Sequence, residues 1–270
     1  MTKPFLKWVG GKRQLLPDIR PLIPDLSGRY FEPFMGGAAV FFDIAPQQAY
    51  LRDINEELVN CYCQVRDHAD ELLADLKRHI YDKDYYYQVR NLDRDEDAYA
   101  QLSNIERASR LIFLNRTGFN GMYRVNRKGQ FNIPFGRYAN PTIANETLIR
   151  EASAALQQAD IRCQPYLTLL SEAEAGDFIY FDPPYLPISK TANFTAYAAD
   201  DFTLSDQEEL AAICRTLDQK QVKFLLSNTY HEVITSLYEG FDFIKIEARR
   251  AINSKADKRQ AVPEILIKNY

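Results

Sequence analysis

The sequence predicts an α/β fold with a mostly parallel sheet, into which a helical segment is inserted. Short apolar runs, such as residues 176–181 and 221–227, alternate with stretches of helical periodicity, which is typical of strands joined by helices. The last two alternating runs, residues 241–248 and 262–268, have no helix between them, which indicates an antiparallel edge.

Individual elements follow from periodicity and turn residues. We expect strands at residues 29–34, 48–52, 176–181, 221–227, 241–248 and 262–268, and helices at residues 40–44, 55–66, 69–81, 98–114, 205–217 and 231–238. Ser205 is a candidate N-cap of its helix, with Glu208 at the capping-box position. Residues 115–141 are rich in Gly, Asn and Arg with interleaved aromatic residues, which predicts loops or a small ribbon.

These patterns divide the chain into two parts. Residues 1–56 and 145–270 are expected to form the domain that contains the sheet, and residues 57–144 an inserted, mainly helical subdomain. No apolar run is long enough to span a membrane, and the first residues lack the apolar region of a signal peptide, so we expect a cytoplasmic protein. The cysteines and histidines show no spacing typical of a metal site, so we expect no metal.

The net charge of -4 on its own disfavours a nucleic-acid partner. Its distribution leaves such a partner open, because residues 104–138 hold seven basic residues against one acid and residues 245–259 hold six against two. Two segments of this kind can present a positive face to phosphates, although two solvated surfaces would explain them equally well.

A carboxylate directly follows an apolar strand in the motif Asp182-Pro183-Pro184-Tyr185. Ligands of such sheets bind at the carboxyl ends of the strands. The prolines stiffen the turn, so that Asp182 and the Pro183 carbonyl can accept the two hydrogens of an exocyclic amine, while Tyr185 can stack on a base. A purely structural turn is the alternative, and the preceding strand makes it the less favoured one.

A second candidate site combines a small-residue turn at residues 34–38 with an acid at the end of the next strand. Gly36 would let a ligand approach the backbone, and Asp53 would bind ribose hydroxyls. The turn lacks a full dinucleotide fingerprint, so a tight strand-to-helix turn is an equal explanation. Near the start of the chain, Trp8 offers a stacking face or a core anchor, and Lys12 could meet a carboxylate.

Together these residues resemble the Dam-type family of DNA adenine methyltransferases, particularly its DpnII-type GATC enzymes. The motifs FLKWVGGK, EPFMGGAAVFF, LRDIN, NRTGFNGMYRVN, FNIPFGRY, DPPY and NFTAY occur in the family's order. The resemblance implies a Rossmann-like class I S-adenosylmethionine-dependent methyltransferase sheet, with residues 57–144 as the target-recognition subdomain. It also implies transfer of a methyl group from S-adenosylmethionine to adenine N6 in double-stranded DNA, within GATC, with no metal, membrane or obligate protein partner.

The resemblance assigns roles to individual residues. The implied cofactor contacts are Trp8, Lys12, Gly36, Asp53 and Asp182. Among them, Lys12 would meet the methionine carboxylate and Asp53 would hold the ribose, whereas Ala38 stands where the family has a glycine. The implied catalytic residues are Asp182, Pro183 and Tyr185.

The implied DNA-binding residues are Lys7, Phe119, Asn120, Met122, Arg124 and Arg137. The resemblance places Phe119, Asn120 and Met122 where residues enter the base stack or support the opened duplex. It places Arg124 at a guanine, and an arginine can indeed bond guanine O6 and N7 together. Lys7 is expected at a base and Arg137 at a phosphate; without the motif, packing and solvated charges would be the preferred explanations.

Two other functions stay open. The chain could be another amino methyltransferase acting on cytosine N4, RNA or a protein amide, which an assay on DNA, RNA and protein substrates would separate. It could instead be a non-catalytic nucleic-acid-binding module, against which the intact Asp53, Asp182 and Tyr185 argue. Failure to bind S-adenosylmethionine would favour that second alternative.

Overall fold

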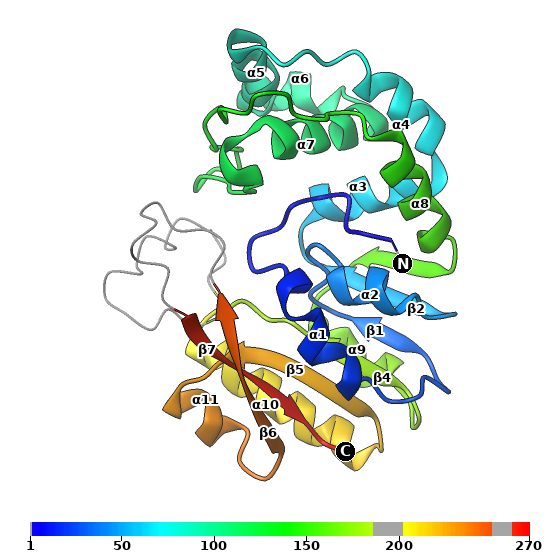
Figure 1. Ribbon diagram of the computed structural model, residues 1–270, viewed down its shortest axis with the longest axis vertical. Helices are drawn as coiled ribbons and strands as arrows, with labels where there is room; N and C mark the ends of the chain where they lie inside the picture. The colour runs from blue at the N-terminus through cyan, green and yellow to red at the C-terminus, as the bar shows by residue number, and fades with distance from the viewer. Residues whose placement is uncertain (1, 186–201, 250–260) are drawn as a thin grey trace.

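The computed structural model describes residues 2–185, 202–249 and 261–270, which form a mixed α/β structure around a seven-stranded sheet (Figure 1). The strand order is β3-β2-β1-β4-β5-β7-β6. The strands are β1 (Tyr30–Glu32), β2 (Ala49–Asp53), β3 (Ala159–Cys163), β4 (Phe178–Phe181), β5 (Lys223–Thr229), β6 (Asp242–Arg249) and β7 (Ala261–Lys268). Strands β1 to β5 pair in parallel, and β7 pairs antiparallel with β5 and β6, so the predicted fold class and its antiparallel edge are confirmed.

Helices cover the sheet and form a separate layer beside it. They are α1 (Leu16–Ile19), α2 (Ala39–Ile44), α3 (Glu56–Asp67), α4 (Ala69–Leu76), α5 (Lys83–Arg90), α6 (Glu96–Ala100), α7 (Asn104–Thr117), α8 (Glu146–Leu156), α9 (Leu169–Glu172), α10 (Leu204–Gln219) and α11 (Glu232–Leu237). Figure 1 shows α4 to α7 gathered at the end of the molecule farthest from β6 and β7. Helix α3 joins the two layers, since it contacts β2 and β3 as well as α7.

Both faces of the central strands β1, β4 and β5 are buried, which explains the continuous apolar run in β4. In β4, Phe178 and Tyr180 belong to the core shared with α3, α4, α7 and α8. Their neighbours Ile179 and Phe181 belong to the core shared with α10 and α11. Successive side chains of a strand point to opposite faces, so this four-residue strand packs against both layers. The start of the segment that follows β4 is therefore fixed in position.

Helix α7 is the centre of the helical layer. It begins at a capping box in which Ser103 and Glu106 bond each other's backbone, and this cap separates it from α6. The predicted helix at residues 98–114 is therefore two helices. A third apolar cluster, which includes Tyr86, Phe113 and Ile133, packs the following loop against α7.

Further expectations about the elements were wrong, among them the helix at residues 69–81, which ends at Leu76. The N-cap of helix α10 lies two residues earlier than expected, because Thr203 is the N-cap and Asp206 completes the capping box in place of Ser205 and Glu208. Strand β3 was not expected at all, although it pairs with β2 at the edge of the sheet. Across the described ranges, no helix is both long and apolar enough to cross a bilayer.

Candidate active site

The carboxyl ends of three parallel strands meet at one edge of the sheet. Strand β1 lies between β2 and β4, and the chain winds from β1 toward β3 on one side and from β4 toward β5 on the other. Asp53 ends β2, and Asp182 directly follows β4. Because ligands of open α/β sheets bind where the winding direction reverses, the two predicted acids flank the expected position.

The turn after β1 is built around Gly36 and Asp53. The Gly36 amide donates to Oδ2 of Asp53 at 3.0 Å, and the Asn55 amide donates to Oδ1 at 3.0 Å. Burial raises the pKa of the Asp53 carboxyl, and the amide bonds oppose that rise. Gly36 has a φ of +46°, and a Cβ atom there would lie 2.9 Å from Cδ1 of Trp8, so no larger residue fits.

Ala38 also adopts a left-handed conformation, with a φ of 47° at the N-cap of α2. A glycine would adopt this conformation at lower cost, which gives a physical reason for the glycine that the resemblance implies there. The alanine keeps the same turn, because its amide donates to the Met35 carbonyl at 2.6 Å.

The amino-terminal segment joins the two acids. Gly10 has a φ of +79°, and the Gly11 amide donates to the Trp8 carbonyl at 3.1 Å, which closes a tight turn. On one side of this turn Trp8 lies against Gly36, and on the other side Lys12 lies against Asp182. One short segment therefore contacts both halves of the candidate site.

Lys12 and Asp182 form a largely buried ion pair. The Lys12 Nζ lies 2.6 Å from Oδ1 of Asp182, and the side chains are 5% and 22% exposed. The Ser227 hydroxyl donates to the same oxygen at 3.0 Å, and the Tyr180 hydroxyl donates to Ser227 at 3.2 Å. Within the described part of the chain, no donor bonds Oδ2 of Asp182, so one carboxylate oxygen is held and the other is open.

This ion pair differs from the partner that the resemblance implies for Lys12. The structure gives the lysine a protein carboxylate, because a charge buried to this degree needs a close counter-charge. Its Nζ also donates to the Gly10 carbonyl at 2.8 Å. A contact between Lys12 and the methionine carboxylate of a cofactor stays a prediction.

The prolines and Tyr185 form a rigid corner. The Pro184 carbonyl accepts from Nε2 of Gln207 at 3.1 Å, and Gln207 accepts from the buried Asn228 at 3.0 Å. Over the residues that the structure describes, the Pro183 carbonyl has no donor. The Tyr185 hydroxyl donates to Oε2 of Glu264 at 2.7 Å, so the corner is fixed by α10 and β7.

The Tyr185 ring is also held from its face. The Lys12 Nζ lies 4.8 Å from the ring centroid, at a distance typical of a cation–π contact. Burial is the largest cause of the raised pKa of the Tyr185 phenol, and the nearby Asp182 adds to it. The neutral phenol can therefore donate to Glu264 over the whole physiological pH range.

Glu32 is a buried acid in the same place. It ends β1, is 3% exposed, and accepts from the Phe41 amide at 3.3 Å. Burial raises its pKa to about 8, and the charge of Asp182 contributes to the rise. A protonated Glu32 removes a negative charge beside Asp182 at neutral pH.

The predicted wedge residues separate into an exposed tip and a packed base. Phe119 is 47% exposed, and Asn120 follows it with a φ of 57° in the short 3-10 turn η4 (Phe119–Gly121). Met122 is partly buried and packs against the apolar cluster around Phe113. Phe119 and Asn120 are thus free to contact a partner, whereas a direct role of Met122 in the opened duplex stays a prediction.

Arg124 stands at the start of a hairpin. Val125 pairs with Phe131, and the Asn126 amide donates to the Gln130 carbonyl at 2.8 Å. The exposed Arg124 donates through Nε to Oδ1 of Asn132 at 2.7 Å. This bond orients the guanidinium, whose two terminal nitrogens have no acceptor in the described ranges, so they can bond a partner.

The remaining predicted DNA contacts are Lys7 and Arg137. The Lys7 Nζ lies 5.1 Å from the Tyr138 ring centroid, and burial together with the Arg116 charge lowers the lysine pKa. The Tyr138 hydroxyl donates to the Gly118 carbonyl at 3.0 Å. Arg137 is exposed. The NFTAY motif, residues 193–197, lies outside the described residues.

Four residues of this region were not expected to take part. Ser227 ends an expected strand, so its position was an available signal. Glu32 lies inside the expected strand at residues 29–34 and ends only the observed β1, and Gln164 and Glu264 had no such signal. The backbone amide of Gln164 donates to the Asp53 backbone carbonyl at 3.1 Å, and the side-chain Oε1 of Gln164 is buried with no hydrogen-bond partner among the described residues. A buried acceptor of this kind suits a partner that brings a donor.

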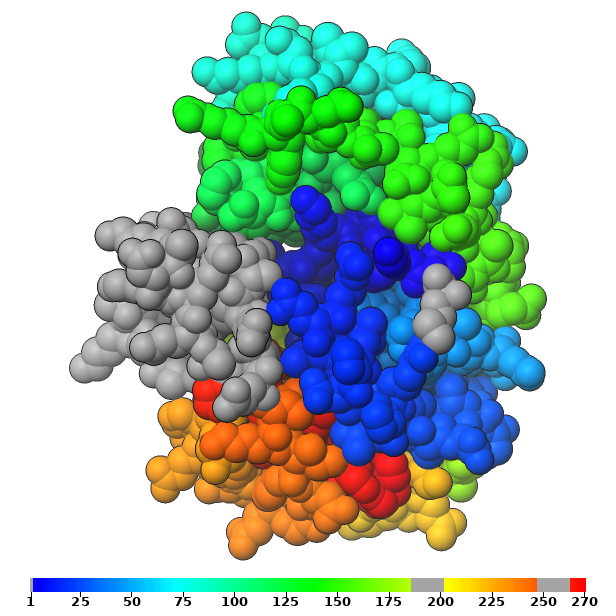
Figure 2. Space-filling model, in the orientation of Figure 1, coloured from blue at the N-terminus to red at the C-terminus, as the bar shows by residue number. Residues whose placement is uncertain are grey.

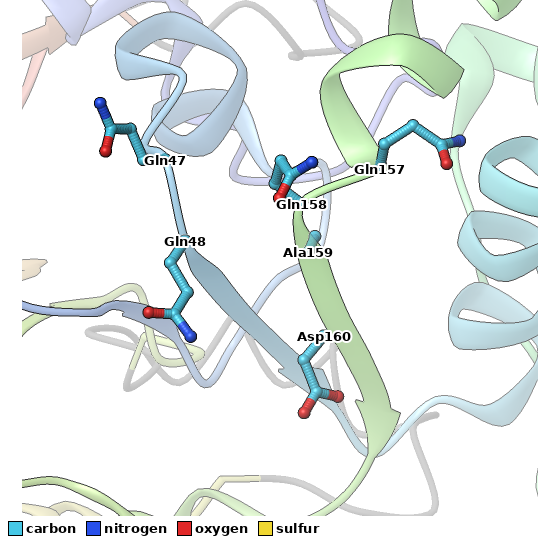
Figure 3. Close-up of a pocket in the computed structure, with 6 residues that line it drawn as sticks. All are labelled: Gln47, Gln48, Gln157, Gln158, Ala159 and Asp160. Atoms are coloured by element: carbon cyan, nitrogen blue, oxygen red, sulfur yellow. The ribbon is translucent and has the colours of Figure 1, made fainter.

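The hollow in Figure 3 is a different feature. It has a volume of about 530 Å³ and lies where β2 and β3 begin, at the end of these strands opposite to Asp53. Its lining residues are Gln47, Gln48, Gln157, Gln158, Ala159 and Asp160. None of the predicted site residues lines this hollow, so its volume does not mark the active site. In the parts that the structure covers, no group of three or more His, Cys, Asp or Glu is arranged to hold a metal ion.

Comparison with known proteins gives a consistent match over the whole chain. Residues 8–252 match the family described as D12 class N6 adenine-specific DNA methyltransferase. The type II methyltransferase M1.LlaDCHI of Lactococcus lactis subsp. cremoris is 43% identical, over 99% of this chain and 95% of its own. The type II methyltransferase M.MjaIII of Methanocaldococcus jannaschii is 40% identical, over 100% and 99%. The DNA adenine methylase of Escherichia coli K12 is 35% identical, over 98% and 94%.

Proposed function

Because this chain belongs to the D12 class N6 adenine-specific DNA methyltransferase family, we propose that the site between Asp53 and Asp182 methylates adenine within GATC in duplex DNA. The chain is an adenine-specific DNA methyltransferase, and its substrate is DNA. Recognition of GATC is the part that we propose beyond the family assignment. It is supported by the resemblance of the recognition segment and by the orientation of Arg124. We place this activity on DNA in the cytoplasm.

S-adenosylmethionine is the co-substrate of this family and supplies a methyl group that its sulfonium already activates. The residues around Gly36 fit such a ligand, because this turn presents a glycine backbone beside the Asp53 carboxylate, with the Trp8 ring packed against the glycine. Gln164, whose backbone amide donates to the Asp53 backbone carbonyl at 3.1 Å, also has a side-chain Oε1 without a partner among the described residues. Asp53 would accept hydrogen bonds from the ribose hydroxyls, and Trp8 would pack against the turn at Gly36.

The single observation that carries the mechanism is that the two oxygens of Asp182 have different surroundings. Lys12 and Ser227 hold Oδ1, while Oδ2 and the Pro183 carbonyl have no donor among the described residues. An adenine N6 amine has two hydrogens, and these two acceptors would take one each. The nitrogen lone pair would then point away from both acceptors, toward the methyl donor, so most of the acceleration would come from positioning.

Tyr185 would complete the pocket for the flipped base. Its ring is fixed by Glu264 at the hydroxyl and by Lys12 at a face, so the ring can stack on a base without losing further freedom. A neutral Glu32 would keep the local charge close to that of the Lys12–Asp182 pair alone. No strong base is required, because the amine nitrogen is oriented before attack.

The η4 turn and the hairpin that follows it would contact the DNA and recognise its sequence. Phe119 and Asn120 would enter the base stack in place of the flipped adenine, and Arg124 would bond one guanine. Lys7 would contact a base beside the methyl-donor turn. Arg137 would meet a phosphate, which affects affinity on all sequences alike.

The test is methyl transfer from labelled S-adenosylmethionine to matched duplexes, followed by digestion with methylation-sensitive nucleases. We expect label in the adenine of GATC and little label in duplexes that differ from GATC at one base pair. Equal labelling of the altered duplexes would overturn GATC. Labelling of RNA or protein in preference to DNA would overturn the assignment of this site to duplex adenine.

A further inference from the structure

The amino-terminal segment lies between the helical part and the sheet, as Figure 2 shows by its blue atoms. It holds Trp8 against Gly36 on the methyl-donor side. One residue before, Lys7 lies beside Tyr138 on the recognition side. Any movement of this segment would therefore change contacts on both the methyl-donor side and the recognition side.

A single buried side chain bonds this segment to the recognition loop. Asn115, in the last turns of α7, is 1% exposed. Its Oδ1 accepts from the Lys7 amide at 2.9 Å, and its Nδ2 donates to the Lys7 carbonyl at 2.7 Å. The same Nδ2 donates to the Gly121 carbonyl at 2.8 Å, so every hydrogen-bonding group of the amide is used in joining the two segments.

Gly121 is the base of the exposed tip formed by Phe119 and Asn120. Its φ is +65°, and a Cβ atom there would lie 2.4 Å from Cδ of Lys7. The two segments are thus in direct contact with no spare volume between them. A displacement of the tip on entering DNA must move Gly121, and with it the partners of Asn115.

The neighbouring contacts strengthen this connection. Arg116 donates to the Phe5 carbonyl at 2.6 Å, which ties a second residue of α7 to the amino-terminal segment. The Trp8 ring stacks on Tyr123, with centroids 5.1 Å apart and planes 21° apart. Tyr123 belongs to the recognition loop, so Trp8 is held between the methyl-donor turn and that loop.

We propose that Asn115 is a positioning residue that couples DNA recognition to the methyl-donor site, by transmitting movement of Gly121 to the Lys7 peptide and thus to Trp8. The inference rests on the proposed function for the identity of the two ligands. Since coupling between two binding sites is reciprocal, each ligand must change the binding free energy of the other by the same amount. Asn115 touches neither ligand in this arrangement, so its effect is indirect.

The chain's single tryptophan makes the coupling directly observable. A GATC duplex is added without any methyl donor, and Trp8 emission is followed while anisotropy of a labelled duplex reports binding. In the wild-type protein, duplex binding is expected to change Trp8 emission. Asn115→Asp keeps the acceptor for the Lys7 amide but replaces the donor to both carbonyls, so it should bind the duplex and lose most of the Trp8 change.

Thr117→Val is the matched control. Thr117 is equally buried in α7, but its hydroxyl donates within the helix, to the Phe113 carbonyl at 2.6 Å. This variant should show the full Trp8 response. A full response in folded Asn115→Asp, loss of duplex binding by that variant, or no response in the wild type would overturn the inference; failure of the wild type to bind any duplex would overturn the proposed function instead.

A second measurement needs no variant and covers the case in which Asn115→Asp does not fold. S-adenosylhomocysteine is added to the wild-type protein without DNA, and hydrogen exchange is followed in the peptide that covers residues 118–124. The coupling predicts slower exchange there, several-fold below that of the free protein. Unchanged exchange, with ligand binding established by calorimetry, would contradict it.

Discussion

The ammonium group of Lys12 lies 2.6 Å from a carboxylate oxygen of Asp182, although one residue belongs to the amino-terminal segment and the other follows the fourth strand. The pair leaves the second oxygen of Asp182 without a donor among the described residues. It also places a cation 4.8 Å from the centre of the Tyr185 ring. The geometry of the catalytic corner thus depends on a residue outside the corner.

Lys12→Ala should destabilise the protein by about 3 kcal/mol, because it leaves a largely buried carboxylate without its counter-charge. The value should lie at the low end for such pairs, since Asp182 is 22% exposed and keeps the bond from Ser227. Urea unfolding of Lys12→Ala, Asp182→Asn and the double variant forms a cycle that isolates the pair. Additive effects of the two substitutions would contradict a direct interaction.

Tyr185→Ala should lower kcat/KM by about 10–100-fold, because stacking on a base contributes about 1–3 kcal/mol. Tyr185→Phe keeps the stacking ring and loses the bond to the Glu264 carboxylate, which lowers folding stability by about 1.5–3 kcal/mol, so its kcat/KM should fall less than that of Tyr185→Ala. Steady-state kinetics on a GATC duplex compare the two. Equal losses in both variants would show that the hydroxyl, rather than the ring, matters.

Glu32 should make the stability of the protein fall as the pH rises. Its pKa is raised from 4.5 to about 8, so between these values the unfolded chain loses a proton that the folded chain retains. In this window the group lowers the unfolding free energy by up to about 1.4 kcal/mol per pH unit. Glu32→Gln should therefore gain stability relative to the wild type up to pH 8, with no further gain above it.

The measurement for Glu32 is urea unfolding of both proteins across this pH range. Below pH 4.5 the two profiles should run parallel, because both states of the wild-type protein are then protonated. Parallel profiles over the whole range would mean that Glu32 is ionised in the folded protein at neutral pH.

Arg124→Ala should relax the preference for one guanine by about 1–3 kcal/mol, because an arginine that bonds O6 and N7 distinguishes guanine from the other bases. Asn132→Ala should act in the same direction and more weakly, since Asn132 only orients the guanidinium. Arg137→Ala is the control, and should weaken binding equally on every duplex with a smaller dependence on salt. Equal weakening by Arg124→Ala on all sequences would make it a phosphate contact.

The sheet was predictable because its strands are apolar runs separated by helical periodicity. Strand β3 was not, because it is an edge strand in which Arg162 and Cys163 are exposed and few apolar residues mark it. The error at the start of α10 has a similar origin, since Thr203 and Ser205 are both good caps and only the backbone distinguishes them.

The site was predictable where it is local in sequence. The small-residue turn and the motif after β4 each follow a strand, so their positions at the strand ends could be inferred. The contacts across the fold could not, because Lys12 reaches Asp182 and Tyr185 reaches Glu264 only through the order of the strands. The division into a sheet domain and a helical recognition subdomain, residues 57–144, stays a prediction, since α3 packs against both layers.

The central claim is that Asp182 positions the adenine amine, and single-turnover methylation of a GATC duplex by Asp182→Ala tests it most directly. Circular dichroism and duplex binding first establish that the variant is folded. The account predicts a rate lower by about 10²–10³-fold or more, with little change in duplex affinity, because the group acts on the amine in the transition state. A folded Asp182→Ala protein that methylates at close to the wild-type rate would contradict it.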